Sequence, residues 1–246
     1  MELAQWYLLP IVAFFGALAT FFTGFGLNTI LVPVFLWYVD PALGVFFAGL
    51  VHLANNVLKV SITAKKIDWM LFRSFGLPAL FGAALGAFLL IQIGGSYNGI
   101  LKPIFGLLFM FFAILEFFNW RFSKFSTTQL NVGGFLSGFF GGLAGVQGAL
   151  RSAFLIKAGL SKESFIATTV VVSTFVDITR LSVYTTRFDK AGLTDNMTLV
   201  ICATLSAIVG AYIGNKLLKK VTLHFVKITV AVLLILISLG LGSGIL

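Results

Sequence analysis

The stretch GGLAGVQGALRSAFL, residues 141–155, decides the fold that this sequence predicts. It lies in an apolar segment that is too long for one straight membrane helix, and Gly145 and Gly148 interrupt that segment near its middle. Gln147 and Arg151 stand one helical turn apart beside the interruption. Because an ionisable side chain in hydrocarbon costs at least about 2.5–3.5 kcal/mol, we expect Arg151 to face a partner or a cavity.

The rest of the chain has the composition of a membrane protein. Of its 246 residues, 59% are hydrophobic, only 10% are charged and 28 are Phe, and its mean hydropathy is +1.05. Apolar runs of about 20 residues recur along the chain, enough to cross roughly 30 Å of hydrocarbon as helices. Since no alternating pattern suggests a barrel, the predicted fold class is an all-α polytopic membrane protein.

Charge and cysteine content exclude other classes of protein. The net charge of +9 comes largely from Lys and Arg at predicted helix ends, where the positive-inside rule explains them, so no nucleic-acid partner is expected. The single cysteine, Cys202, lies in an apolar run and provides neither a disulfide nor a cysteine-rich metal site. We expect no cofactor.

The apolar runs divide the chain into two similar halves. Six runs predict spanning helices at about 41–64, 69–93, 97–119, 161–185, 193–218 and 222–241. Two longer segments, about 6–39 and 129–159, are each broken by glycines, TGFGLN at 23–28 and AGVQGA at 144–149. Each broken segment is a span plus a stub or a re-entrant hairpin. The hinge glycines would be Gly24, Gly26, Gly145 and Gly148, and the two halves would be residues 1–121 and 122–246.

The distribution of Lys and Arg favours the hairpins. If each broken segment crosses once, the thirteen basic residues of the loops divide seven to six between the two sides. If each turns back at its glycines, ten share one side: Lys65, Lys66, Arg73, Arg121, Lys124, Lys157, Lys162, Lys216, Lys219 and Lys220. Lys102, Arg187 and Lys190 remain opposite. The positive-inside rule therefore predicts six spans and two hairpins in the cell membrane, with both termini outside.

This topology places the second half upside down relative to the first, so an internal repeat is expected. A shift of 121 residues aligns these pairs: Gly24 with Gly145, Val51 with Val172, Asn56 with Asp177, Lys59 with Arg180, Ser61 with Ser182 and Asp68 with Asp189. Gly82 and Gly86 match Gly210 and Gly214 once seven further residues are allowed. Inverted repeats with broken helices that meet near the midplane are typical of secondary transporters.

Polar residues within the apolar runs mark the candidate site. His52, Asn55, Asn56 and Lys59 are spaced i, i+3, i+4 and i+7, so all four share one face of the helix at 41–64. This polar face either lines a substrate path or serves structure only, with Lys59 reaching the interface and the asparagines bonding to neighbouring helices.

The second half carries matching polar residues. Asp177 and Arg180 form an i,i+3 ion pair or line the same path, since a guanidinium can bind a carboxylate and still present other donors. At the break, the free N–H groups of a half-helix that starts near Gly148 would attract an anion, and Arg151 and Gln147 would add donors. The equivalent tip in the first half supplies Asn28. The alternative is that the glycines serve close packing and that Asp177 balances Arg151.

Several of these motifs resemble the TauE/SafE family of membrane permeases, named for export of sulfite and organosulfonates. The resemblance rests on TGFGLNTILVPVF (23–35), VHLANNVLKV (51–60), KKIDW (65–69), the run GGFLSGFFGGLAGVQGALRSAFLIKAGLSKESFIAT (133–168) and VDITRLSVY (176–184), and it covers nearly the whole chain. Leu27 and Asn28 replace the fuller glycine run of other branches. The resemblance implies transport of a small sulfur-containing anion. The site residues that it implies are Asn55, Asn56, Lys59, Gln147, Arg151, Asp177 and Arg180.

The sequence thus predicts a secondary transporter, an exporter of a small oxyanion such as sulfite or a sulfonate, and not an enzyme. The expected substrate-binding residues are Asn28, His52, Asn55, Asn56, Lys59, Gln147, Arg151 and Arg180. Asp177 or His52 would couple proton movement, since no nucleotide-binding loop is present. An anion channel, a carboxylate transporter and a scaffold remain alternatives, and homo-oligomers are compatible with all of them.

Overall fold

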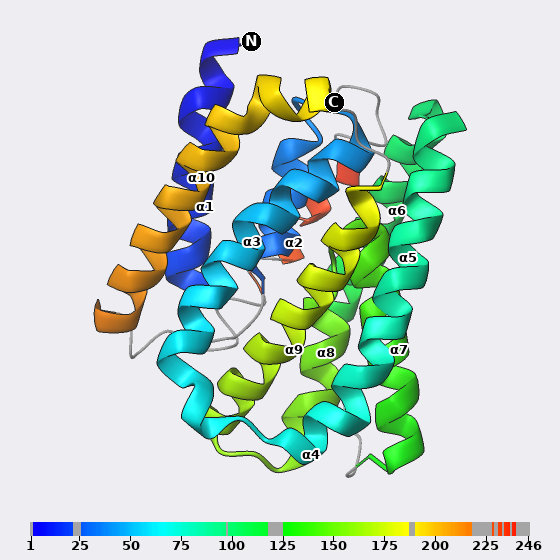
Figure 1. The fold of residues 1–246 in the computed structure, drawn as a ribbon, viewed down its shortest axis with the longest axis vertical. Helices are drawn as coiled ribbons and strands as arrows, with labels where there is room; N and C mark the ends of the chain where they lie inside the picture. The colour runs from blue at the N-terminus through cyan, green and yellow to red at the C-terminus, as the bar shows by residue number, and fades with distance from the viewer. Residues whose placement is uncertain are drawn as a thin grey trace.

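The structure is a computed structural model that describes residues 2–21, 26–96, 98–117, 125–186 and 190–217, with eight further residues between 228 and 239. All regular structure in these residues is helical, which confirms the prediction of an all-α protein. Figure 1 shows long helices side by side, with α3 and α9 in the middle of the bundle.

The described residues of the first half form six α-helices. They are α1 (Glu2–Thr20), α2 (Leu27–Phe35), α3 (Pro41–Thr63), the short α4 (Trp69–Leu71), α5 (Leu77–Ser96) and α6 (Asn98–Phe117). A 3₁₀ turn, η1 (Ala64–Lys66), follows α3, and a π-helical turn, η2 (Phe72–Gly76), leads into α5. The π turn lies inside the helix predicted at 69–93, which is therefore less regular at its start than expected.

The second half begins with another broken pair, α7 (Thr127–Ala144) and α8 (Gly148–Leu155). The 3₁₀ turn η3 (Ile156–Ala158) and the long helices α9 (Lys162–Tyr184) and α10 (Lys190–Leu217) follow. Most of the helix predicted at 222–241 lies outside the described residues.

Among the described residues, four helices are long and apolar enough to cross a membrane, at Pro41–Lys66, Trp69–Gly94, Lys162–Tyr184 and Asn196–Lys216. They coincide with four of the six predicted spans. The apolar part of α6, Leu101–Leu115, is shorter, as is that of α1, Trp6–Thr20.

Local sequence signals explain where these helices begin. Ser126 caps α7 reciprocally: its hydroxyl accepts from the Gln129 N–H at 3.3 Å, and the Gln129 side chain accepts from the Ser126 N–H at 2.9 Å. The Ser161 hydroxyl caps α9 by accepting from the Ser164 N–H. Pro41 occupies the first turn of α3, where its missing N–H costs nothing.

Helices α5 and α7 are in backbone contact along glycines. A Cβ on Gly134, Gly138 or Gly142 of α7 would overlap backbone carbonyls at the start of α5 and just before it, those of Phe75, Ala79 and Ala83. Since both residue numbers rise together, the two helices run parallel. Close backbone approach through small residues is how membrane helices associate tightly, because lipid provides no hydrophobic drive.

The same contact recurs between α1 and α10, which lie side by side in Figure 1. The corresponding glycine and backbone pairs are Gly82–Phe135 and Gly86–Phe139 in the first contact, and Gly210–Phe14 and Gly214–Leu18 in the second. The α1 and α7 residues of these pairs stand 121 positions apart, and the glycines 128 apart, which is the shift seen in the sequence.

Candidate functional site

The broken helix of the second half is an antiparallel pair joined by a glycine turn. Helix α7 ends at Gly145, whose φ of 74° is left-handed, and α8 begins at Gly148. The Ser137 hydroxyl of α7 donates to the carbonyl of Gln147 at 3.1 Å. Gln147 is the N-cap residue of α8, so the first free N–H groups of that helix lie inside the protein.

The tip of the first pair contacts the tip of the second. Asn28, in the first turn of α2, donates from Nδ2 to the Gly145 carbonyl at 2.7 Å, which joins residues 117 positions apart. A Cβ on Gly145 would lie 2.5 Å from Asn28 Nδ2, so only glycine fits. Gly26, before α2, has a φ of 109° and also requires glycine. Gly24 lies outside the described residues.

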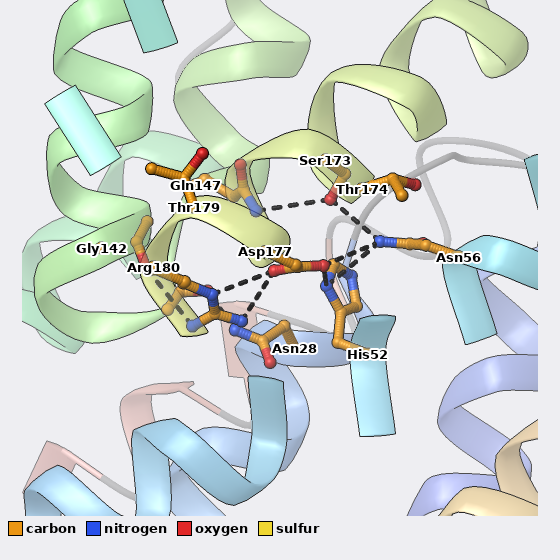
Figure 2. Close-up of polar contacts among 12 residues, drawn as sticks. Asn28, His52, Asn56, Gly142, Gln147, Ser173, Thr174, Asp177, Thr179 and Arg180 are labelled. Atoms are coloured by element: carbon orange, nitrogen blue, oxygen red, sulfur yellow. Dashed lines mark hydrogen bonds and ion pairs between the residues drawn. The ribbon is translucent and has the colours of Figure 1, made fainter. Parts of the chain in front are cut away.

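Asp177 lies at the crossing of α3 and α9 and has no exposed surface. Its Oδ2 is 2.7 Å from His52 Nδ1 and accepts from Asn56 Nδ2 at 3.1 Å. Its Oδ1 accepts from Arg180 Nε at 3.0 Å and pairs with Arg180 Nη2 at 2.8 Å. Figure 2 shows this carboxylate between His52 and Asn56 of α3 and Arg180 of its own helix. The expected i,i+3 pair is therefore present and is part of a larger network.

The contacts across this crossing follow the 121-residue shift. Asn56 Nδ2 donates to Ser173 Oγ at 3.1 Å. The shift relates Asn56 to Asp177 and Ser173 to His52, so the equivalent contact in the other half is the one between Asp177 and His52. The Asn56–Asp177 bond corresponds to itself when the two halves are exchanged, because the two residues stand 121 positions apart. Helices α3 and α9 run antiparallel here, because Gly49 lies against Arg180 while Asn56 lies against Ser173.

Two buried cations hold the ends of the broken helices. Lys59 Nζ donates to the Thr20 carbonyl in the last turn of α1, and Arg180 Nη1 donates to the Gly141 carbonyl in the last turn of α7, each at 3.4 Å. These pairs are also related by 121 positions. A cation at a helix C-terminus offsets the negative end of the helix dipole. Lys59 and Arg180 therefore stabilise the C-terminal ends of α1 and α7.

Arg151 and Gln147 occupy the start of α8, beside this crossing. Arg151 is 1% exposed and interacts electrostatically with Asp177, His52 and Lys59. Gln147 donates from Nε2 to Ser173 Oγ at 3.3 Å, as Figure 2 shows. The N-terminus of α8 is thus joined to α9 through a side-chain amide.

Several buried polar atoms near the crossing have no hydrogen-bond partner among the described residues. Both amide atoms of Asn55, Gln147 Oε1, Thr169 Oγ1 and Asn28 Oδ1 are in this group. Nearly all buried polar groups in proteins are satisfied, because an unsatisfied one costs about 1–3 kcal/mol. Unpartnered buried polar atoms on several helices that meet at one crossing are typical of a site that binds a polar ligand.

The nine predicted polar residues are all buried, none more than 4% exposed. His52, Asn56, Asp177, Arg180 and Gln147 belong to one hydrogen-bonded network, which includes Ser173. Asn28 belongs to the contact between the tips, and Lys59 to the end of α1. Substrate binding by these residues stays a prediction.

The candidate site includes three further residues that the sequence analysis did not identify as site residues. Tyr184 donates to the Gly142 carbonyl and is fully buried, Ser137 supports the Gln147 carbonyl, and the Thr169 hydroxyl is buried without a hydrogen-bond partner among the described residues. Thr169 and Tyr184 share the face of α9 that carries Ser173, Asp177 and Arg180, so their spacing was the available signal.

Broken helices that meet around buried cations, within a bundle of long apolar helices, are typical of membrane transporters. Residues 9–241 match the family described as "Sulfite exporter TauE/SafE". The chain therefore belongs to this family of multi-pass membrane transporters. Comparisons with curated proteins and with solved structures gave no match.

Proposed function

We propose that this protein is a secondary transporter that exports a small sulfur-containing anion, such as sulfite or a sulfonate, and that it is not an enzyme. The observation that carries the proposal is the group of buried polar atoms around Asn55, Gln147 and Thr169 that lack partners among the described residues, beside the buried Arg151. A bound oxyanion would accept from the donors in this group, the Asn55 Nδ2 amide and the Thr169 hydroxyl, and so remove the cost of burying those two donors.

The charges of the buried crossing also favour an anion. Lys59, Arg151 and Arg180 are buried together with a single carboxylate among the described residues there, Asp177, which leaves two positive charges in excess when His52 is neutral. Asp177 and the end of α7 already engage Arg180, and the end of α1 engages Lys59. We assign Arg151 as the main cation for the substrate because its planar fork lies at the start of α8, where the helix N-terminus also favours an anion.

We propose an inverted repeat with re-entrant hairpins as the architecture behind this site. The repeated glycine contacts of α5 with α7 and of α10 with α1 support it, as do the paired contacts across the antiparallel helices α3 and α9. Each hairpin would then enter and leave the membrane on the same side, with both termini outside and the Lys-rich ends inside. Access would alternate by movement of one half against the other.

We further propose that protons drive transport through His52 and Asp177. Their side chains lie 2.7 Å apart at the axis that relates the two halves, so a proton taken up by His52 would change the charge that faces the substrate. Asp177 also holds Arg180, which links this pair to the end of α7.

A ligand panel and a flux assay test the proposal. We expect sulfite or a short sulfonate to raise the melting temperature of the purified protein, and acetate to have a smaller effect. In proteoliposomes, Arg151→Gln should abolish saturable flux, while Arg73→Gln, which changes an exposed arginine, should not. Equal flux in the two variants would remove Arg151 from the site. A larger rise in melting temperature with carboxylates than with sulfur oxyanions would show that the substrate is a carboxylate. Unitary currents in a planar bilayer would show that the protein is a channel.

A further inference from the structure

A cavity of about 390 Å³ opens at one end of the bundle, where α1, α3, α9 and α10 end or begin. Its lining includes Phe21, Thr63, Lys66, Lys162, Ile166 and Asn215. Lys66 and Lys162 are exposed at this end, and they belong to the ten basic residues predicted to share the inner side.

The helix faces that line the cavity also carry residues of the buried crossing. On α9, Ile166 lines the cavity, and the fully buried Thr169 and Ser173 follow it at i+3 and i+7 on the same face. On α3, Ile62 lines the cavity and shares a face with Lys59. The Lys59 ammonium lies 5.6 Å from the centroid of the Phe21 ring, which borders both the cavity and the site.

At the other end of the bundle, the described residues equivalent to Thr63 and Ile166 are packed. A separate cavity of about 410 Å³ at that end, whose lining includes Trp37, Asp40, Lys102 and Asn196, involves neither of these equivalents. The 121-residue shift converts Thr63 to Tyr184 and Phe21 to Gly142. The Tyr184 ring is fully buried, its hydroxyl donates to the Gly142 carbonyl, and its ring centroid lies 6.2 Å from that of Phe46. Val45, which corresponds to Ile166, is fully buried as well.

We propose that the structure represents a conformation in which the site is accessible from the Lys66 and Lys162 end, and that Tyr184 is the gate that closes the path from the site to the opposite end. This inference rests on the proposed transport function and adds the access path to it. Thr63 marks the equivalent position of the open end, where an anion would enter between the lysines.

The position of Tyr184 couples the gate to the site. Its hydroxyl also interacts with the guanidinium of Arg180, which holds Asp177 and the Gly141 carbonyl. A change of charge at Asp177, or an anion that attracts Arg180, would therefore alter the contacts that keep Tyr184 in place. Opening of the far end would follow from events at the site itself.

Cysteine accessibility tests this inference. In a Cys202→Ala background, which removes the single cysteine, Ile166→Cys reports on the open end and Val45→Cys on the closed end. The probe is a negatively charged methanethiosulfonate reagent, applied to purified protein in detergent, where both ends are exposed. We expect the Ile166→Cys variant to react at least about tenfold faster than the Val45→Cys variant. Equal rates in this background would overturn the inference.

Variants of the gate provide the second half of the test. Tyr184→Phe, which keeps the ring and removes the hydroxyl, should accelerate modification of the Val45→Cys thiol, and Thr63→Tyr should slow modification of the Ile166→Cys thiol. A melting curve verifies that each variant is folded, and unchanged labelling in folded Tyr184→Phe would show that its hydroxyl does not hold the gate closed. Because the labelling needs no substrate, absence of anion flux would reject the transport proposal separately.

Discussion

Replacement of Asn55 by leucine separates a ligand-binding role from a structural one. Asn55 is fully buried in α3, and neither of its amide atoms has a partner among the described residues. The adjacent Asn56 is the matched control, because its amide donates to Ser173 and Asp177, both at 3.1 Å. Leucine has nearly the size and branching of asparagine, so both replacements change polarity more than shape.

The two variants should shift stability in opposite directions. An unsatisfied buried polar group costs about 1–3 kcal/mol, so Asn55→Leu should raise the free energy of unfolding by about that amount. Asn56→Leu removes two hydrogen bonds from a buried network and should lower it by about 1–3 kcal/mol. At roughly 2–4 °C per kcal/mol for a chain of this size, the melting temperatures of the two variants should differ by about 4 °C or more.

Thermal unfolding of purified protein, with and without sulfite, measures both effects. Without the anion, Asn55→Leu should melt above the parent and Asn56→Leu below it. With the anion, Asn55→Leu should lose most of the stabilisation that the parent gains. The reasoning is refuted if Asn55→Leu melts below the parent, or if it keeps the full sulfite-induced shift.

Three further variants test the packing and the buried charges, each by its melting temperature. A left-handed alanine costs about 1–2 kcal/mol, and Gly145→Ala should lower the stability by more than this because its Cβ has no room. The control Gly159→Ala has the same φ of 74° in open space and should lose only the cost of the left-handed backbone. Equal losses would contradict the contact between the tips of the two broken helices. Gly138→Val should prevent folding, because α5 backbone fills the space of the new side chain, and a folded variant would contradict the backbone contact. Asp177→Asn should cost about 3–5 kcal/mol by leaving a buried arginine without its carboxylate, and a loss under about 1 kcal/mol would show that the pair is not buried.

The positions of the breaks and of the polar faces could be predicted from sequence. Glycines in an overlong apolar run mark a place where a helix can end in a left-handed turn, and α7 does end at Ala144, directly before the left-handed Gly145. The i, i+3, i+4 and i+7 spacing of His52 to Lys59 fixes one helical face, and all four side chains are buried. Helical periodicity is a local property, so it can be read from a single chain.

The partners of those side chains could not be predicted. Lys59 donates to a backbone carbonyl of α1, and every residue has such a carbonyl, so no side chain in the sequence identifies the acceptor. The same holds for Arg180 and Gly141. The role of Tyr184 was missed for a related reason: in an apolar helix a tyrosine resembles core packing until its hydroxyl is found against the Gly142 carbonyl.

The proposed two-fold axis would explain why the halves differ at the point where Asn56 meets Asp177. Residues that meet across such an axis are equivalent, so an identical repeat would place two carboxylates, or two amides, where Asn56 now meets Asp177 at 3.1 Å. Two buried carboxylates at that distance repel each other. With asparagine on one side the contact becomes a hydrogen bond, and the single negative charge belongs to the half that carries Arg180 and Tyr184. Divergence at this position therefore stabilises the crossing and also makes its two ends chemically unequal.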